Sequence, residues 1–96
     1  MNSLINLALI GASGVVGKKI ISLLENKNIE INNFYPVGST SVGDEILFNN
    51  NEYKIEDLTN FDYTKVNLAI FSAGSKVAEE HAKDFVNAGS YVIDLS

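Results

Sequence analysis

Three glycines near the start of the sequence have the spacing that points most directly to chemistry. Gly11, Gly14 and Gly17 follow an apolar run and open a stretch with helical periodicity. In a turn from a strand into a helix, the first glycine lets the chain turn sharply and the second lets the backbone approach a phosphate. The third lets the helix pack closely against the sheet. This pattern predicts a loop that binds the pyrophosphate of a dinucleotide.

Main-chain amides supply the contacts to phosphate in a loop of this kind. The residues at the expected start of the helix, where amides are unpaired, are Ser13, Gly14, Val15 and Val16. Because the positive end of the helix dipole also lies there, an anion is favoured at this point. The hydroxyl of Ser13 can add a donor. The spacing is G-x-x-G-x-x-G rather than G-x-G-x-x-G, so a plain tight turn whose glycines serve packing remains the alternative.

The carboxyl end of the second expected strand carries hydroxyl groups rather than a carboxylate. Ser39, Thr40 and Ser41 follow directly after Val37 and Gly38. Domains that bind NAD usually place Asp or Glu at this point, where it accepts the ribose 2′-hydroxyl. Since no acid stands there, the sequence favours NADP over NAD, although no Arg is present to pair with a 2′-phosphate. The alternative is that these three residues only form a turn.

A second turn of small residues follows a later apolar run. Ser72, Ala73 and Gly74 come directly after Phe71 and precede another helical stretch. Ligands of open parallel sheets bind outside the carboxyl ends of the strands, so we expect these residues to line the cofactor. A short strand-to-helix turn in which Ser75 caps the helix is the alternative, and both interpretations can hold together.

Short apolar runs predict the strands that must hold these turns. Residues 4–10, 66–71 and 91–95 are nearly continuous apolar segments without clean period-2 alternation. Such segments are typical of parallel strands buried on both faces beneath helices. A more polar run at residues 31–37 is the remaining candidate strand of the sheet.

Helices are expected between these strands, at residues 15–27 and 76–88, because apolar residues recur there at helical spacing. Gly89 is a suitable end for the second helix. The middle of the chain has no helical period. There, an Asn-rich turn at residues 49–51 predicts a small hairpin over residues 45–55.

The order of the expected elements indicates the fold class. A strand, a helix, a strand, a hairpin, a strand, a helix and a strand predict an α/β, Rossmann-like, doubly wound parallel sheet with a small hairpin excursion. Residues 57–63 are expected to form a loop or a single helical turn. The sequence of 96 residues suffices for one NAD(P)-binding domain over residues 1–96. Since it ends just after an expected core strand, we expect it to belong to a longer two-domain enzyme.

Composition excludes several other kinds of chemistry. The sequence has no Cys and one His, which excludes thiol catalysis, disulfides and a multi-His metal site within this span. His81 is expected on a helix flank rather than in catalysis. The formal net charge of −5 disfavours nonspecific binding to nucleic acid or to anionic membranes. The first apolar run is too short to cross a bilayer and lacks a basic leader, so a cytoplasmic location is expected.

Four motifs, in this order and spacing, resemble the N-terminal part of aspartate-semialdehyde dehydrogenases. They are GASGVVG at residues 11–17, STSVG at 39–43, FSAG at 71–74 and VIDLS at 92–96. The resemblance covers essentially the whole chain. The sequence departs from the family at Leu95, where members usually carry Asn.

The resemblance implies an NADP-dependent interconversion of L-aspartyl 4-phosphate and aspartate semialdehyde. This reaction serves lysine, threonine and methionine biosynthesis, and the enzyme is a homodimer or homotetramer. Residues 13–16 would hold the pyrophosphate, Thr40 and Ser41 would lie near the 2′-phosphate, and residues 72–74 would line the cofactor. The family's nucleophilic Cys, its acid–base His and its substrate-binding Arg residues have no counterpart here. We therefore expect this span to bind cofactor without catalysing the reaction.

Other functions remain open at this stage. N-acetyl-glutamyl-phosphate reductases share a Gly-Ala-Ser-Gly loop, although they usually continue with Tyr-Thr where this sequence has Val15 and Val16. A stand-alone NAD(P)-binding or sensing module would bind cofactor without chemistry. A structural domain with a vestigial loop would bind neither NADPH nor NADH.

Overall fold

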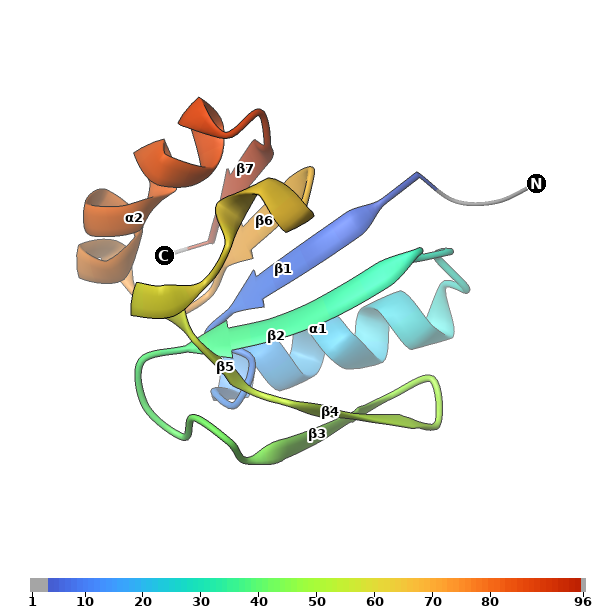
Figure 1. Ribbon diagram of the computed structural model, residues 1–96. Coiled ribbons are helices and arrows are strands. Elements are labelled where there is room, and N and C mark those ends of the chain that lie inside the picture. The colour runs from blue at the N-terminus through green and yellow to red at the C-terminus, as the bar shows by residue number, and fades with distance from the viewer. Residues whose placement is uncertain (1–3, 96) are drawn as a thin grey trace.

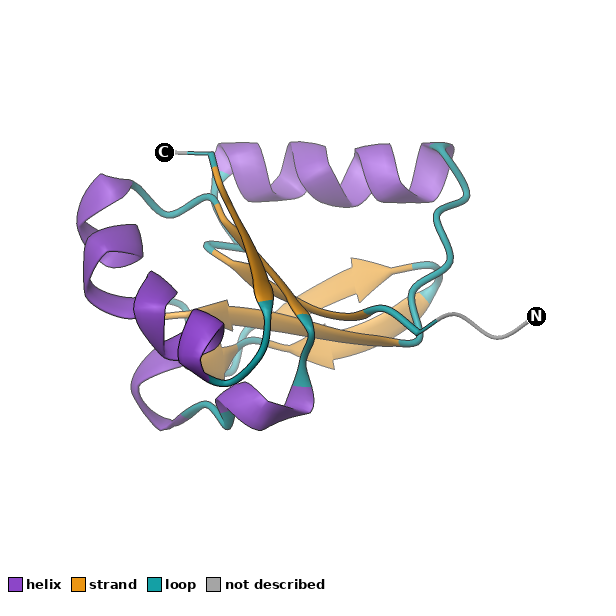
Figure 2. Ribbon diagram, turned by 90° about the horizontal axis from the view of Figure 1, so that it is seen from above, coloured by secondary structure: helices purple, strands orange, loops and turns teal. Residues whose placement is uncertain are grey.

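A parallel sheet with helices on both faces forms the centre of the computed structural model, which describes residues 4–95 (Figures 1 and 2). The order of its five strands is β5-β2-β1-β6-β7, and every neighbouring pair is parallel. The strands are β1 (Asn6–Ile10), β2 (Asn33–Gly38), β5 (Glu56–Asp57), β6 (Leu68–Phe71) and β7 (Tyr91–Asp94). This architecture confirms the predicted doubly wound, Rossmann-like fold.

Each face of the sheet has its own helix and its own apolar core. Helix α1 (Val15–Asn26) lies along one face, and α2 (Ser75–Asn87) lies on the other (Figure 2). In the α1 core, Leu24 packs with Leu7 of β1. In the α2 core, Phe85 packs with the neighbouring residue of β1, Ala8. Successive residues of β1 therefore enter opposite cores, which explains why this strand is apolar without alternation.

The predicted hairpin is present and is antiparallel. It consists of β3 (Glu45–Phe48) and β4 (Asn51–Lys54). Its turn has two residues rather than the three predicted, because Asn51 already pairs with Phe48. Asn49 and Asn50 have φ values of 50° and 66°, the left-handed backbone that a two-residue hairpin turn requires and that asparagine tolerates.

Aromatic contacts attach the hairpin to the sheet. The ring of Phe34 in β2 stacks on Phe48 with a centroid distance of 4.5 Å, and it meets the edge of Tyr53 at 5.1 Å. Phe34 and Phe48 are both buried in the α1 core. The hairpin therefore covers the α1 face beyond β2, where the helix does not reach.

One strand of the sheet was not predicted. Strand β5 has two residues, Glu56–Asp57, and pairs in parallel with Val37 and Gly38 of β2. Two 3-10 helices follow it. The first, η1 (Leu58–Asn60), lies within residues 57–63, which were predicted to be a loop or one helical turn, whereas η2 (Tyr63–Lys65) extends beyond that region. A strand of this length shows no periodicity that sequence reading can detect.

Most element ends lie within two residues of the predicted positions. The prediction that Ser75 caps α2 is wrong. The N-cap residue is Gly74, and Ser75 is the first helical residue. The predicted end of α2 is confirmed, because Gly89 follows the helix with a φ of 99° and its N–H donates to the carbonyl oxygen of Val86 at 3.0 Å.

The prediction that the last strand is buried on both faces is also wrong. Strand β7 lies at an edge of the sheet, where Tyr91 is 82% exposed and Ile93 is 45% exposed. Val92, which points to the other face, packs against the α2 core. The α1 core contains residues of β1, β2 and β6 but none of β7, which leaves the Tyr91 side of β7 outside this core.

Asparagine side chains connect the starts of the strands at the amino edge of the sheet. The Oδ1 atom of Asn6 accepts hydrogen bonds from the Nδ2 groups of Asn32 and Asn33, each at 2.9 Å. The Oδ1 atom of Asn67 accepts the N–H of Asn6 at 2.8 Å, and its Nδ2 group donates to the carbonyl oxygen of Leu4 at 2.6 Å. These bonds join the segments that lead into β1, β2 and β6. Among residues 4–95, no helix has the length and apolar character needed to cross a membrane.

Candidate functional site

The carboxyl edge of the sheet contains a crevice of about 370 Å³. Three segments that lie far apart in the sequence meet there, at the ends of β1, β2 and β6. Predicted site residues line it: Gly11, Ser13, Gly14, Ser39, Thr40, Ser72 and Ala73. The glycine loop, the hydroxyl-rich turn and the second small-residue turn thus surround a single space.

Five of the predicted site residues do not line this crevice: Val15, Val16, Gly17, Ser41 and Gly74. The side chains of Val15 and Val16 are exposed, although both residues begin α1. Gly17 is buried within the first turn of the helix. Ser41 lies beyond the lining with a φ of 60°, and Gly74 is the N-cap of α2. Asp94 does not line the crevice either, and Ser96 lies outside the described residues.

The geometry of the glycine loop explains why side chains are missing from it. Gly11 has a φ of 87°, and its carbonyl oxygen accepts the N–H of Gly14 at 3.1 Å. A Cβ atom added to Gly17 would lie 2.3 Å from the carbonyl oxygen of Gly11. A Cβ on Gly14 would meet that oxygen only at 3.4 Å, which is ordinary contact. Gly11 and Gly17 are therefore required by the fold. At Gly14 the fold has room for a methyl group, so the missing side chain there serves instead to leave the loop backbone accessible from the crevice.

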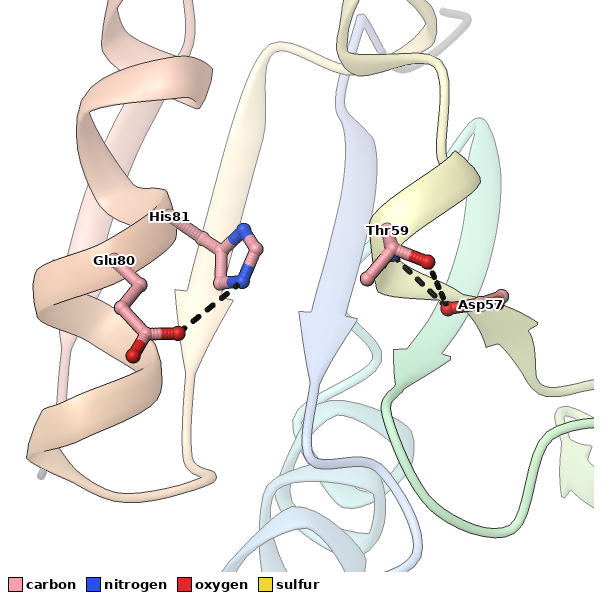
Figure 3. A network of polar contacts seen from close by, with 4 residues as sticks. All are labelled: Asp57, Thr59, Glu80 and His81. Carbon is pink, nitrogen blue, oxygen red and sulfur yellow. Dashed lines mark hydrogen bonds and ion pairs between the residues drawn. The ribbon is translucent and has the colours of Figure 1, made fainter.

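The two long helices begin without a side-chain cap. Gly14 and Gly74 are the N-cap residues of α1 and α2, and neither helix has a side-chain hydrogen bond at this end. The 3-10 helices differ, because Asp57 accepts the N–H of Thr59 at 3.0 Å (Figure 3) and Asp62 caps η2 in the same way. The first-turn amides of both long helices are therefore available to an anionic ligand at the crevice.

None of the described residues that line the crevice carries a charge. Phosphate binding there would depend on main-chain N–H groups, hydroxyls and helix dipoles. Strand β5 nevertheless places Glu56 and Asp57 beside Val37 and Gly38 at the end of β2. Neither of these two acidic residues lines the crevice. The carboxylate of Asp57 is engaged with η1, where the hydroxyl of Thr59 donates to it at 2.8 Å.

Sequence reasoning missed four residues that line the crevice: Ile10, Gly38, Leu58 and Val77. Leu58 is almost fully buried, and Val77 is half-buried against the α2 core. Both give the crevice an apolar side. Val77 was detectable, because it lies in the first turn of the helix that follows Gly74. Leu58 was not, since it reaches the crevice only through the unpredicted strand β5.

His81 lies on α2 and does not line the crevice. Its Nε2 atom is 3.9 Å from a carboxylate oxygen of Glu80 (Figure 3), and its side chain is 21% exposed. This position agrees with the helix flank expected from the sequence. Among residues 4–95, His, Asp and Glu side chains form no group of three or more that could hold a metal ion.

Comparisons with known proteins show which protein family this chain is similar to. A family model described as "Semialdehyde dehydrogenase, NAD binding domain" matches residues 6–96. The aspartate-semialdehyde dehydrogenase of Legionella pneumophila is 42% identical over 95 residues, which cover 98% of this chain and 27% of the relative. The chain therefore spans little more than a quarter of that relative's length.

Solved structures agree with the match. The crystal structure of aspartate semialdehyde dehydrogenase II complexed with ASA from Vibrio cholerae has a TM-score of 0.92 and 29% identity, over 96% of this chain and 30% of the other. The structure of a probable aspartate-semialdehyde dehydrogenase from Pseudomonas aeruginosa has a TM-score of 0.93 and 33% identity, over 98% and 28%.

Proposed function

The chain belongs to the semialdehyde dehydrogenase family, whose NAD-binding domain it carries, and we propose that its crevice binds NADP for an aspartate-semialdehyde dehydrogenase. One observation carries this proposal: two helices without side-chain caps and three turns of small residues meet at one uncharged crevice. A dinucleotide pyrophosphate needs close-lying N–H donors at a helix start. The names of the relatives support aspartate semialdehyde over N-acetyl-glutamyl phosphate as the substrate class.

The positions of the three turns suggest which part of the cofactor each would contact. The amide of Gly14 closes the turn on the carbonyl oxygen of Gly11, so the amides of Ser13, Val15 and Val16 would bind the pyrophosphate at the start of α1. The hydroxyls of Ser39 and Thr40, with Ser41 beyond them, would lie near the adenosine ribose, next to the apolar side chain of Leu58. Residues 72–74 would lie along the remainder of the cofactor at the start of α2.

NADP is proposed ahead of NAD because hydroxyl groups, and no carboxylate, follow directly after β2. The preference should be modest. No Lys or Arg among residues 4–95 lines the crevice, and β5 holds two acidic residues beside the end of β2. A 2′-phosphate carries negative charge that these carboxylates would repel.

The reaction proposed for the full-length enzyme is the reductive dephosphorylation of L-aspartyl 4-phosphate to aspartate semialdehyde. The enzyme would be a cytoplasmic homo-oligomer that serves lysine, threonine and methionine biosynthesis. Reduction of an acyl phosphate through a covalent intermediate needs a nucleophile, and the 96 residues contain no Cys. The role of this chain is therefore to bind and orient the cofactor, which supplies the hydride when bound.

Isothermal titration calorimetry of the 96-residue chain with NADPH and with NADH tests the proposal. We expect saturable binding of both, with the lower dissociation constant for NADPH, and no turnover of acyl phosphate. Absence of binding for both ligands would contradict the proposed function. Tighter binding of NADH would contradict the cofactor preference alone.

A further inference from the structure

The hydroxyl of Ser72 points to the glycine loop. Its Oγ atom lies 2.8 Å from the carbonyl oxygen of Ile10 and 3.3 Å from that of Gly11, and it shares its one hydrogen between these two acceptors, with the shorter contact to Ile10. The main-chain N–H of Ser72 also donates to Ile10, at 2.9 Å. Ser72 thus connects the end of β6 to the end of β1 through two separate donors.

The carbonyl group of Gly11 determines the shape of the glycine loop. It accepts the N–H of Gly14, which closes the turn, and it lies directly against Gly17. The orientation of this peptide group therefore fixes the direction of the Gly14 amide and of the amides that follow it. A hydrogen bond from Ser72 to the same oxygen restrains that orientation from outside the loop.

The two turns also touch directly. A Cβ atom added to Gly11 would lie 2.9 Å from both the amide nitrogen and the Cβ atom of Ala73. The glycine loop and the second turn are therefore packed against each other without space between them. A shift of either turn toward the other would make Gly11 and Ala73 clash.

We propose that Ser72 is a positioning residue for the cofactor site, whose hydroxyl holds the glycine loop in the shape that directs the amides of Ser13, Val15 and Val16 at the pyrophosphate. This inference rests on the proposed function. A hydroxyl group has one hydrogen, and that of Ser72 is used on the carbonyl groups of Ile10 and Gly11. Phosphate oxygens only accept hydrogen bonds, so Ser72 has no donor left for them. It lines the crevice but acts through Gly11.

The chain offers a matched control at the opposite edge of the sheet. The hydroxyl of Ser90 donates to the carbonyl oxygen of Val66 at 3.0 Å, and Ser90 is buried. This bond joins the segments that lead into β6 and β7, far from the crevice. Ser90→Ala therefore removes the same kind of bond, from a serine hydroxyl to a main-chain carbonyl, without touching the glycine loop.

The test compares Ser72→Ala, Ser72→Thr and Ser90→Ala in the 96-residue chain. Loss of the Ser72 hydroxyl should raise the dissociation constant for NADPH about three- to tenfold, the effect of one neutral hydrogen bond. The ¹H–¹⁵N spectrum of unliganded Ser72→Ala should show a shifted amide signal for Gly14. Ser72→Thr, which keeps the hydroxyl, should have the wild-type dissociation constant for NADPH and the wild-type Gly14 amide signal. Ser90→Ala should lower stability and leave the dissociation constant and the Gly14 amide signal unchanged.

The unliganded spectra separate the two proposals. An unshifted Gly14 amide in Ser72→Ala, with or without a change in affinity, would overturn the positioning role. Unchanged affinity despite a shifted amide would overturn it as well. Failure of the wild-type chain to bind NADPH would instead contradict the proposed function.

Discussion

At the amino edge of the parallel sheet, polar side chains bond to one another, whereas at the carboxyl edge the main chain is left open. Asn6 and Asn67 connect the starts of the strands, and Ser90 adds a buried bond to them. The turns at the other edge consist of glycine, alanine and serine, and both long helices begin there without a cap. The same strands run between these two edges.

The difference indicates that the amino edge stabilises the fold and that the carboxyl edge is the one suited to bind a ligand. Side-chain amides at the amino edge satisfy their partners within the chain, so they contribute to folding and offer little to a ligand. At the carboxyl edge, α1 and α2 begin without side-chain caps, and the missing side chain of Gly11 brings the turns into close contact. Substitutions at the carboxyl edge should act through steric hindrance, and they should change affinity where the residue lines the crevice and stability where it is packed within the fold. Substitutions at the amino edge should change stability alone.

Gly17→Ala should have the largest effect, at the carboxyl edge. The added methyl would lie 2.3 Å from the carbonyl oxygen of Gly11, a main-chain atom that cannot move away freely. We expect a loss of about 3 kcal/mol in the free energy of unfolding, measured by urea denaturation. Gly43→Ala is the control, because Gly43 has a φ of 89° in open space and should lose only about 1 kcal/mol. Equal losses for both variants would contradict the steric explanation.

Gly14→Ala should separate affinity from stability. Gly14 has a φ of −76°, and its added methyl makes only ordinary contact within the protein. Stability should change by less than about 1 kcal/mol. The methyl would stand where the pyrophosphate approaches, so the dissociation constant for NADPH should rise about tenfold or more.

The control for Gly14→Ala lies at the amino edge. Gly89 follows α2 with a φ of 99° and open space around it. Gly89→Ala should cost about 1 kcal/mol of stability and leave NADPH affinity unchanged. Calorimetric titration and thermal unfolding of Gly14→Ala and Gly89→Ala check this difference between the two variants. A loss of NADPH affinity in Gly89→Ala would contradict it.

Asn6→Ala should have a smaller effect, confined to stability. It removes the acceptor for the Nδ2 groups of Asn32 and Asn33 and should cost about 1 kcal/mol in urea denaturation. Asn6→Asp keeps an acceptor oxygen at this position and should retain more stability than the alanine variant. The affinity for NADPH should stay within about twofold in both variants. Weaker binding by Asn6→Ala would show that the two edges are coupled.

The smallest effect should come from the cap of η2, which leads into β6 at the amino edge. Hydrogen bonds from the hydroxyl and the N–H of Thr64 hold the pKa of Asp62 below its usual range. Because the folded pKa lies below the unfolded one, this stabilisation is present above the unfolded pKa and is lost as pH falls through the folded pKa. The free energy of unfolding of Asp62→Asn should therefore fall less steeply than that of the wild type as the pH is lowered. Urea denaturation over a series of acidic pH values checks this, and an unchanged slope would contradict it.

Much of the fold was predictable because apolar runs and turn residues act locally. The resemblance read from the four motifs is confirmed by the family match over residues 6–96. Strand β5 was not predictable, since its pairing depends on β2 and not on its own two residues. The exposure of Tyr91 was not predictable either, because an apolar run does not reveal which of its faces a helix covers.

The candidate site was predictable where glycine and serine mark turns, and not where folding brings distant residues together. Gly11, Gly14 and Ala73 come to the crevice through turns that can be read from the sequence. Leu58 comes from a segment without any local signal. The direction of the Ser72 hydroxyl was also hidden, because its acceptors lie on another strand.

The most direct test of the account is a titration of the ¹⁵N-labelled 96-residue chain with NADPH, followed through its amide signals. If the cofactor binds through the main chain at the carboxyl edge, the amides of residues 13–16, Thr40 and residues 72–74 should shift together. The amides of Asn6 and Asn67 should stay in place. Shifts concentrated at the amino edge, or none at residues 13–16, would contradict the account.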